Sequence, residues 1–115
     1  LGQMKLVMPN SHNVYLHDTP ARQLFQRDVR AFSHGCIRVS NAIDLVETLL
    51  SRQTDWPRSR IDQQLATGKT TTAQLLAEVP VYITYFTAEP DGAGGIRTTA
   101  DIYGRDKKLI EYMPR

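Results

Sequence analysis

The segment that most constrains this chain is residues 33–41, Ser-His-Gly-Cys-Ile-Arg-Val-Ser-Asn, which contains the only cysteine, Cys36. A second histidine, His17, lies upstream in the sequence Tyr-Leu-His-Asp-Thr-Pro. A single cysteine with histidines elsewhere in the chain is a candidate catalytic nucleophile, because an imidazole can take up the thiol proton. The sequence therefore predicts a fold that brings His17 beside Cys36.

The composition is that of one globular domain. With 115 residues, 41% hydrophobic and 23% charged, the chain can bury a single hydrophobic core. The formal net charge of +2 comes without a dense run of Lys or Arg, so we expect no nucleic-acid partner. No apolar run approaches the length of a membrane span. The chain begins with Leu-Gly rather than Met, which suggests a piece of a longer protein.

Two short strands are expected before the cysteine. Residues 4–8 and 13–17 have strand character, and Pro-Asn-Ser between them is typical of a turn, so the two segments predict a β-hairpin. His17 would then lie at the end of a strand. Such a position is suited to presenting a catalytic side chain.

Helices are expected in four places. Thr19 and Pro20 favour a helix start, and the short helix after them would bury Leu24 and Phe25. The clearest helix follows the cysteine segment, where apolar residues recur at helical spacing behind a cap at Ser40 or Asn41. The expected helical segments are residues 21–26, a helix from residue 42 that stops before Asp55, residues 59–67 (ending before Gly68) and, against an extended alternative, a short helix through residues 73–76 within 70–78.

The strongest strand signal is residues 81–87, which carry apolar side chains on both faces and so predict a central strand. The glycine-rich residues 91–95 predict a hairpin turn leading to a partner strand over residues 96–103. The expected fold class is therefore α+β, a sheet combined with helices.

Two histidines compete for the role of general base. His34 is two residues from Cys36, and on a strand this spacing separates the Cα atoms by about 7 Å and directs the imidazole poorly. His17 is free of that constraint, and we expect it to be the base. Consecutive strand residues point to opposite faces, so Asp18 is expected to orient His17 through its main-chain carbonyl rather than its carboxylate.

Other groups near the cysteine are candidates for the site, and most of the side chains among them also have a structural interpretation. The N–H groups of Gly35 and Cys36 can form an oxyanion hole. Arg38 can pair with a substrate carboxylate, or else with an acidic residue such as Asp44. Tyr15 either walls the active site or belongs to the core. His34 either lines the substrate or stabilises a turn, and a lone cysteine is often simply a small buried side chain.

The motif Ser-His-Gly-Cys-Ile-Arg, with a histidine at this upstream interval, resembles the L,D-transpeptidase family, the YkuD-type catalytic domain of bacterial cell-wall enzymes. The chain is most similar to the large periplasmic members of Gram-negative bacteria. The resemblance extends through residues 9–20, 80–88 and 101–106, and so covers nearly the whole chain. It implies a mixed sheet or sandwich with a few short helices. Residues 1–115 would be the C-terminal, motif-bearing portion of the catalytic domain, without the N-terminal strands of the full domain.

The resemblance also implies a reaction. Cys36 would attack the bond between the L-centre of diaminopimelate and the terminal D-alanine of a stem tetrapeptide, releasing D-alanine and leaving a thioester. The side-chain amine of a second stem's diaminopimelate would then form a 3→3 cross-link. His17 corresponds to the general base and Asp18 to its main-chain orienting group. Positions expected to contact substrate or oxyanion are Tyr15, Ser33, His34, Gly35 and Arg38.

The implied setting is the periplasm or cell envelope. The implied partners are peptidoglycan stem peptides, carbapenem inhibitors that acylate Cys36, and accessory cell-wall proteins. No cofactor is expected.

Two other functional classes stay open. One is a non-catalytic wall-binding module with a vestigial site. The other is a zinc site formed by His12, His17, His34 and Cys36. We expect no metal, because these spacings match no familiar structural zinc pattern and a separation of five residues places His12 and His17 on opposite faces of a strand.

Overall fold

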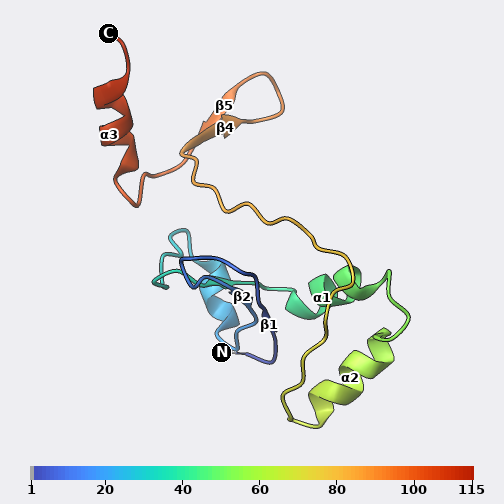
Figure 1. Ribbon diagram of the computed structural model, residues 1–115. Coiled ribbons are helices and arrows are strands. Elements are labelled where there is room, and N and C mark those ends of the chain that lie inside the picture. Colours follow the sequence, from blue (N-terminus) through green and yellow to red (C-terminus); the bar gives the residue numbers. More distant parts are fainter. Residues whose placement is uncertain (1) are drawn as a thin grey trace. The chain divides into compact units, whose positions relative to one another are not determined.

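The computed structural model describes residues 2–115, which divide into two compact units at the junction between Val79 and Pro80. The first unit contains the elements β1 (Lys5–Leu6), β2 (Leu16–His17), the 3-10 helix η1 (Arg22–Gln26), β3 (Ile37–Arg38), α1 (Ala42–Leu50) and α2 (Arg58–Ala66) (Figure 1). The second contains β4 (Ala88–Pro90), β5 (Ile96–Thr98) and α3 (Arg105–Tyr112). Helices combined with small sheets confirm the expected α+β class.

The first unit is built on a mixed three-stranded sheet in the order β1-β2-β3. Strands β1 and β2 are antiparallel, with Lys5 opposite His17, which confirms the expected hairpin. Strands β2 and β3 are parallel, with His17 opposite Arg38. The sheet therefore joins the histidine segment directly to the cysteine segment.

These strands are only two residues long, shorter than the expected residues 4–8 and 13–17. The side chain of Asn10 explains the difference. Its amide nitrogen donates to the carbonyl oxygens of Met8 (2.9 Å) and Val14 (2.7 Å), and its oxygen accepts from the N–H groups of His12 and Val14. Backbone groups that would extend the ladder are thus bonded to one side chain.

The buried apolar residues of the first unit lie on its two α-helices. Ala42, Leu50 and Ile61 are the buried apolar residues of the described chain. Helix α1 begins where expected and ends at Leu50, earlier than the expected limit at Asp55, and α2 agrees with the expected segment to within one residue at each end. Gly68 follows α2 with a positive φ of 65°, a conformation that a glycine adopts without a Cβ penalty.

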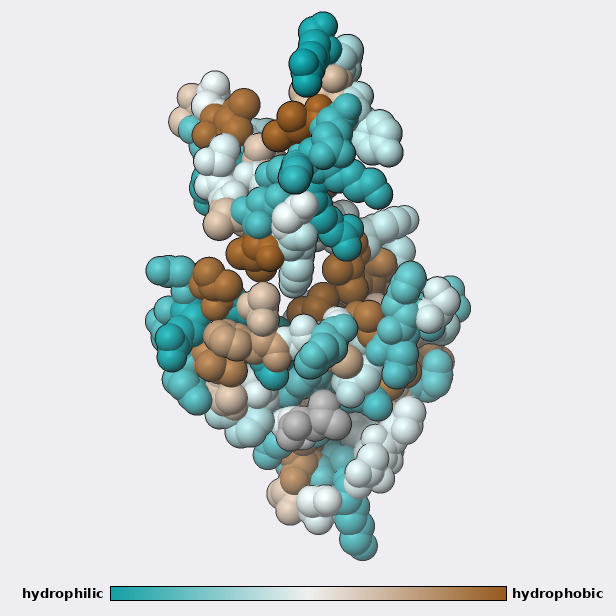
Figure 2. Space-filling model, turned by 90° about the vertical axis from the view of Figure 1, so that its left-hand side faces the viewer, coloured by the Kyte–Doolittle hydropathy of each residue, from teal (hydrophilic) through white to brown (hydrophobic). Residues whose placement is uncertain are grey.

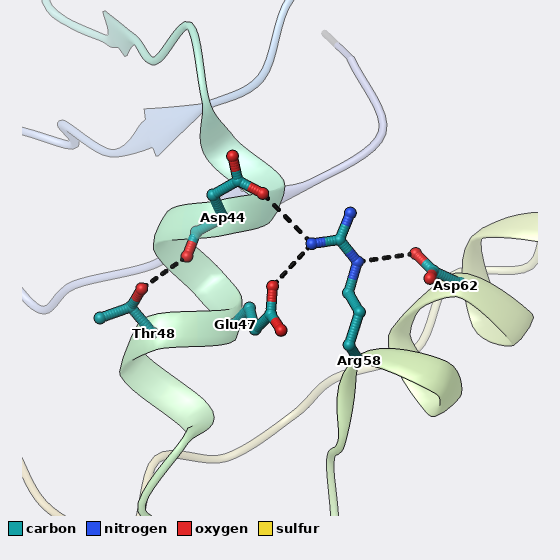
Figure 3. Close-up of polar contacts among 5 residues, drawn as sticks. All are labelled: Asp44, Glu47, Thr48, Arg58 and Asp62. Atoms are coloured by element: carbon teal, nitrogen blue, oxygen red, sulfur yellow. Dashed lines mark hydrogen bonds and ion pairs between the residues drawn. The ribbon is translucent and has the colours of Figure 1, made fainter.

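An ion-pair cluster connects α1 to α2 (Figure 3). The guanidinium of Arg58 on α2 lies 2.6 Å from Glu47 and 3.2 Å from Asp44, both on α1, and 3.0 Å from Asp62 on its own helix. Hydrogen bonds to Glu47, then Asp62, then Asp44 raise the pKa of Arg58 above its ordinary value. The cluster joins the two helices that carry the buried apolar residues of this unit.

The expected helix over residues 21–26 is a 3-10 helix, and the burial predicted for Leu24 and Phe25 is wrong because both are half-buried. Thr19 acts at its start, where its hydroxyl oxygen accepts from the Ala21 N–H (3.2 Å). A 3-10 segment of five residues covers little surface, so its apolar side chains reach only part of the way into the unit.

The helix favoured over residues 70–78 is absent. The side chain of Gln53 holds this segment in another conformation: its amide donates to the Gln74 carbonyl (3.0 Å), and its oxygen accepts from the Leu76 N–H (2.9 Å). The backbone groups that a helix would bond internally are therefore bonded to a distant side chain.

The central strand expected over residues 81–87 is also wrong. The segment pairs with no strand of residues 2–115, and Tyr82 and Phe86 are 85% and 71% exposed. Figure 2 accordingly shows apolar residues, in brown, at the molecular surface. Apolar composition supplies strand propensity, but a strand forms only where a neighbour satisfies its backbone groups.

In the second unit, β4 and β5 form an antiparallel hairpin around the predicted glycine-rich turn. The Asp91 carboxylate accepts from the N–H groups of Ala93 (2.7 Å) and Gly95 (2.9 Å), and these bonds lower the pKa of Asp91. The partner of β5 is therefore residues 88–90 rather than 81–87, and β5 is shorter than the expected residues 96–103.

Helix α3 (Arg105–Tyr112) is not among the helices expected from the sequence. Its start is organised by Asp101, whose carboxylate accepts from the N–H groups of Arg105 (3.0 Å) and Asp106 (2.8 Å). The Tyr85 hydroxyl donates to the same carboxylate (2.5 Å), and the Thr87 hydroxyl donates to Asp106 (2.9 Å). The irregular segment before β4 is thereby attached to the helix start.

Candidate active site

The pairing of β2 with β3 sets the geometry of the candidate site. The Ile37 N–H donates to the Tyr15 carbonyl (3.0 Å), and the Val39 N–H donates to the His17 carbonyl (2.9 Å). Continuing this register by one residue places Tyr15 opposite Cys36. Register partners share a face of the sheet and alternate residues repeat it. The residues gathered on one face are therefore Tyr15, His17, Cys36 and Arg38.

Strand β1 adds Lys5 to the same face, because Lys5 is the register partner of His17. The Lys5 ammonium lies 4.6 Å from the centroid of the Tyr15 ring. The ring of Tyr15 also contacts the imidazole of His17, with centroids 5.7 Å apart and planes inclined by 52°. Tyr15 is thus held between residues from two neighbouring strands.

The imidazole of His17 is buried, and its orientation is defined by the next residue. Its Nδ1 lies 2.6 Å from the main-chain carbonyl oxygen of Asp18, the contact expected from the sequence. That oxygen also accepts from the Gly2 N–H (3.0 Å). A carbonyl oxygen can only accept, so Nδ1 carries the proton and Nε2 keeps a free lone pair.

The Asp18 carboxylate faces a different set of groups. It accepts from the Gln3 N–H (3.0 Å), and the guanidinium of Arg22 lies 4.0 Å away. The carboxylate of Asp18 therefore binds groups other than the imidazole. This agrees with the expectation that Asp18 orients His17 through its main-chain carbonyl.

Cys36 is half-buried immediately before β3. Hydrogen bonding of the phenol to Cys36, then the negative charge of the ionised sulfur, and then burial raise the pKa of the Tyr15 phenol. Strand spacing and rise place the Cα atoms of His17 and Cys36 about 8 Å apart. In residues 2–115 the two side chains share no hydrogen bond, and both are neighbours of Tyr15.

The residues before the cysteine are exposed. The Gly35 N–H, an expected oxyanion donor, donates to the Ser33 hydroxyl at 3.2 Å. A Cβ built on Gly35 would lie 3.5 Å from Val14, an ordinary contact, so the backbone itself does not require glycine here. His34 lies in the same exposed turn.

A sequence model of the YkuD family, the L,D-transpeptidase catalytic domain, matches residues 1–83. The chain belongs to this family. It is also 41% identical over 109 residues to a Haemophilus influenzae protein named "Putative L,D-transpeptidase". That match covers 95% of this chain and 22% of the relative, so the chain spans about a fifth of the length of that protein.

Arg38 of this L,D-transpeptidase family member is half-buried and opposite His17. The alternative partner considered for it, Asp44, pairs instead with Arg58 at 3.2 Å, so the structural pairing of Arg38 with Asp44 is wrong. Within residues 2–115 no carboxylate forms an ion pair with Arg38.

The zinc alternative finds no support in the geometry. The described residues contain no group of three or more His, Cys, Asp or Glu side chains that could hold a metal ion. His12 lies in an exposed turn, where its N–H donates to Asn10.

None of the helices in residues 2–115 is both long and apolar enough to cross a membrane.

Sequence reasoning missed Lys5. Its position opposite His17 depends on the register of the hairpin, and register follows from the length and type of the connection. Because the Asn10-centred connection could not be derived from the sequence, neither could the residue that faces His17. The alternation of residues 4–8 was the available signal.

Proposed function

We propose that this chain carries the nucleophile of a peptidoglycan L,D-transpeptidase, which forms 3→3 cross-links through a Cys36 thioester and releases D-alanine. The observation that carries the proposal is the orientation of His17. Its Nδ1 is bonded to the Asp18 carbonyl, and its ring lies on the sheet face that carries the thiol. Family membership supports the reaction type.

In the first half-reaction, Nε2 of His17 takes the thiol proton as Cys36 sulfur attacks the carbonyl carbon of diaminopimelate. The resulting oxyanion accepts hydrogen bonds from the Cys36 N–H and from the Gly35 N–H, which first releases the Ser33 hydroxyl. Each such donor contributes about 10²–10³ in rate. The carbon–nitrogen bond then breaks, and His17 returns its proton to the D-alanine amine as that product leaves.

In the second half-reaction, the side-chain amine of another stem's diaminopimelate attacks the thioester carbon. His17 takes a proton from the attacking nitrogen, the carbon–sulfur bond breaks, and the sulfur leaves as thiolate. The proton on His17 then passes to the Cys36 thiolate, which restores the starting thiol and the neutral imidazole. The imidazole of His17 thus acts first as base and then as acid in each half-reaction.

Arg38 is suited to binding a substrate carboxylate, because its guanidinium shares the face with Cys36 and has no ion-pair partner in the described chain. Ser33 and His34 are exposed next to the nucleophile and line the substrate. Tyr15 forms the wall between the imidazole and the thiol. Such a site acts on cell-wall stem peptides in the periplasm or cell envelope, is acylated by carbapenems, and works beside accessory cell-wall proteins.

The test uses the full-length protein with a purified tetrapeptide stem as donor and acceptor. We expect release of D-alanine and formation of a cross-linked dimer, both detected by liquid chromatography and mass spectrometry, and both lost in Cys36→Ala. If the protein instead binds peptidoglycan and releases no D-alanine, the chain is a wall-binding module and the proposal is wrong.

A further inference from the structure

The Tyr15 hydroxyl is a polar group next to the nucleophile. In the two half-reactions above, Tyr15 only forms a wall of the site, and its hydroxyl has no role. Tyr15 is the register neighbour of Cys36, since the bond from the Ile37 N–H to the Tyr15 carbonyl (3.0 Å) fixes β3 against this residue. The side chain is half-buried and lies on the face shared with Cys36.

The ring is restrained by two neighbours. The imidazole of His17 lies with its centroid 5.7 Å from the ring, and the Lys5 ammonium lies 4.6 Å from it. A cation over an aromatic face is attracted by the ring quadrupole, and tilted aromatic contacts are favourable. With the ring contacted by both side chains, the direction of its hydroxyl is restricted.

We propose that Tyr15 is a positioning residue for the nucleophile, with its hydroxyl donating a hydrogen bond to the sulfur of Cys36 and its ring oriented by Lys5 and His17. This inference rests on the proposed function in assigning Cys36 as nucleophile. A donor that faces a thiolate stabilises it, because charge-assisted hydrogen bonds are about twice as strong as neutral ones.

The electrostatic surroundings agree with this direction of donation. Hydrogen bonding to Cys36 raises the pKa of the Tyr15 phenol, so the phenol keeps its proton and is the donor. The charged or titratable groups on this face are Lys5 from β1, His17 from β2 and Arg38 from β3. Two of them, Lys5 and Arg38, are cations.

The first test measures alkylation of Cys36 by iodoacetamide in the full-length protein, followed on the peptide that contains Cys36. Tyr15→Phe removes the hydroxyl and keeps the ring. We expect its alkylation rate at pH 7 to fall about threefold to tenfold, the loss expected for one hydrogen bond, with no change at pH 10, where the thiol ionises unaided. Tyr82→Phe, at a tyrosine that is 85% exposed, should match the wild type at both pH values.

The second test needs no variant at Tyr15. In protein labelled with ¹³C at tyrosine Cζ, the Tyr15 resonance should titrate above the ordinary tyrosine value of about 10, and its midpoint should fall after alkylation of Cys36 or in Cys36→Ala. An unchanged midpoint together with wild-type alkylation of Tyr15→Phe at pH 7 would overturn the inference. Neither measurement requires transpeptidation, so a failure here is distinguishable from a failure of the proposed function.

Discussion

The Nδ1 atom of His17 lies 2.6 Å from the main-chain carbonyl oxygen of Asp18, and this contact decides which imidazole nitrogen is basic. Because the carbonyl holds the Nδ1 proton, Nε2 is the atom left to take a proton from a thiol. The contact comes from the backbone of the adjacent residue, so substitution of the Asp18 side chain does not remove it directly.

The assignment of the base predicts unequal effects of two histidine substitutions. His17→Ala should slow acylation of Cys36 by a carbapenem about 10²–10⁴-fold, the usual contribution of a general base. His34→Ala should slow it less than about tenfold, since an exposed lining residue contributes one weak contact. Rates come from the mass of the intact protein over time. Equal losses, or a larger loss in His34→Ala, would reverse the assignment.

Gly35 and Gly68 predict opposite outcomes of the same substitution. Gly35→Ala should leave the melting temperature unchanged, because the added Cβ would make an ordinary contact with Val14 at 3.5 Å. The substitution should slow acylation about 10–100-fold, because the added methyl group crowds the substrate carbonyl. Gly68→Ala should cost about 1–2 kcal/mol of stability, since Gly68 has φ of 65°. Its acylation rate should match the wild type at temperatures where both are folded. If Gly35→Ala acylates normally, the glycine has no role in substrate approach.

The Arg58 cluster predicts a salt-dependent loss of stability. Arg58→Met leaves the carboxylates of Asp44, Glu47 and Asp62 without their shared cation. We expect the melting temperature at low ionic strength to fall by about 2–5 °C, and the difference to shrink in high salt as the exposed charges are screened. Arg52→Met, which removes an exposed arginine without an ion pair in residues 2–115, is the matched control. A salt-independent loss would indicate packing rather than charge.

Asp101 predicts an acid-sensitive helix start in the second unit. The hydrogen bond from Tyr85, then those from backbone N–H groups at the start of α3, lower the pKa of Asp101. The stabilisation is therefore fully present above the unfolded carboxyl pKa of about 3.9 and is lost as pH falls through the lower folded value.

The corresponding measurement is circular dichroism of Asp101→Ala, with Glu111→Ala as a control on the same helix. We expect Asp101→Ala to lose helical signal at pH 7 and to lose the acid transition, while Glu111→Ala keeps both. A wild-type acid transition in Asp101→Ala would assign that transition to another carboxylate.

The sequence predicts best those elements whose stabilisation is local. Helices α1 and α2 follow from apolar periodicity and from Gly68 beyond the second helix. The orienting contact of His17 follows from strand alternation and the chemistry of the next residue. In each case the determining groups lie within a few positions of one another, so a pattern is enough.

The remaining features depend on partners distant in sequence. Residues 81–87 have strand composition but no paired strand in the described chain, and residues 70–78 are held by Gln53 instead of forming a helix. Helix α3 depends on the Asp101 carboxylate, which its basic residues do not reveal. The placement of Lys5 follows from hairpin register. Composition and spacing do not encode these pairings.

Every step of the proposed reaction depends on covalent acylation of the Cys36 sulfur with help from His17. The most direct measurement is the intact mass of the full-length protein after exposure to a carbapenem, with and without a chelator. We expect one adduct located on the peptide containing Cys36, unaffected by chelator and absent in Cys36→Ala. No adduct on the wild-type protein, or an adduct that persists in Cys36→Ala, would contradict it.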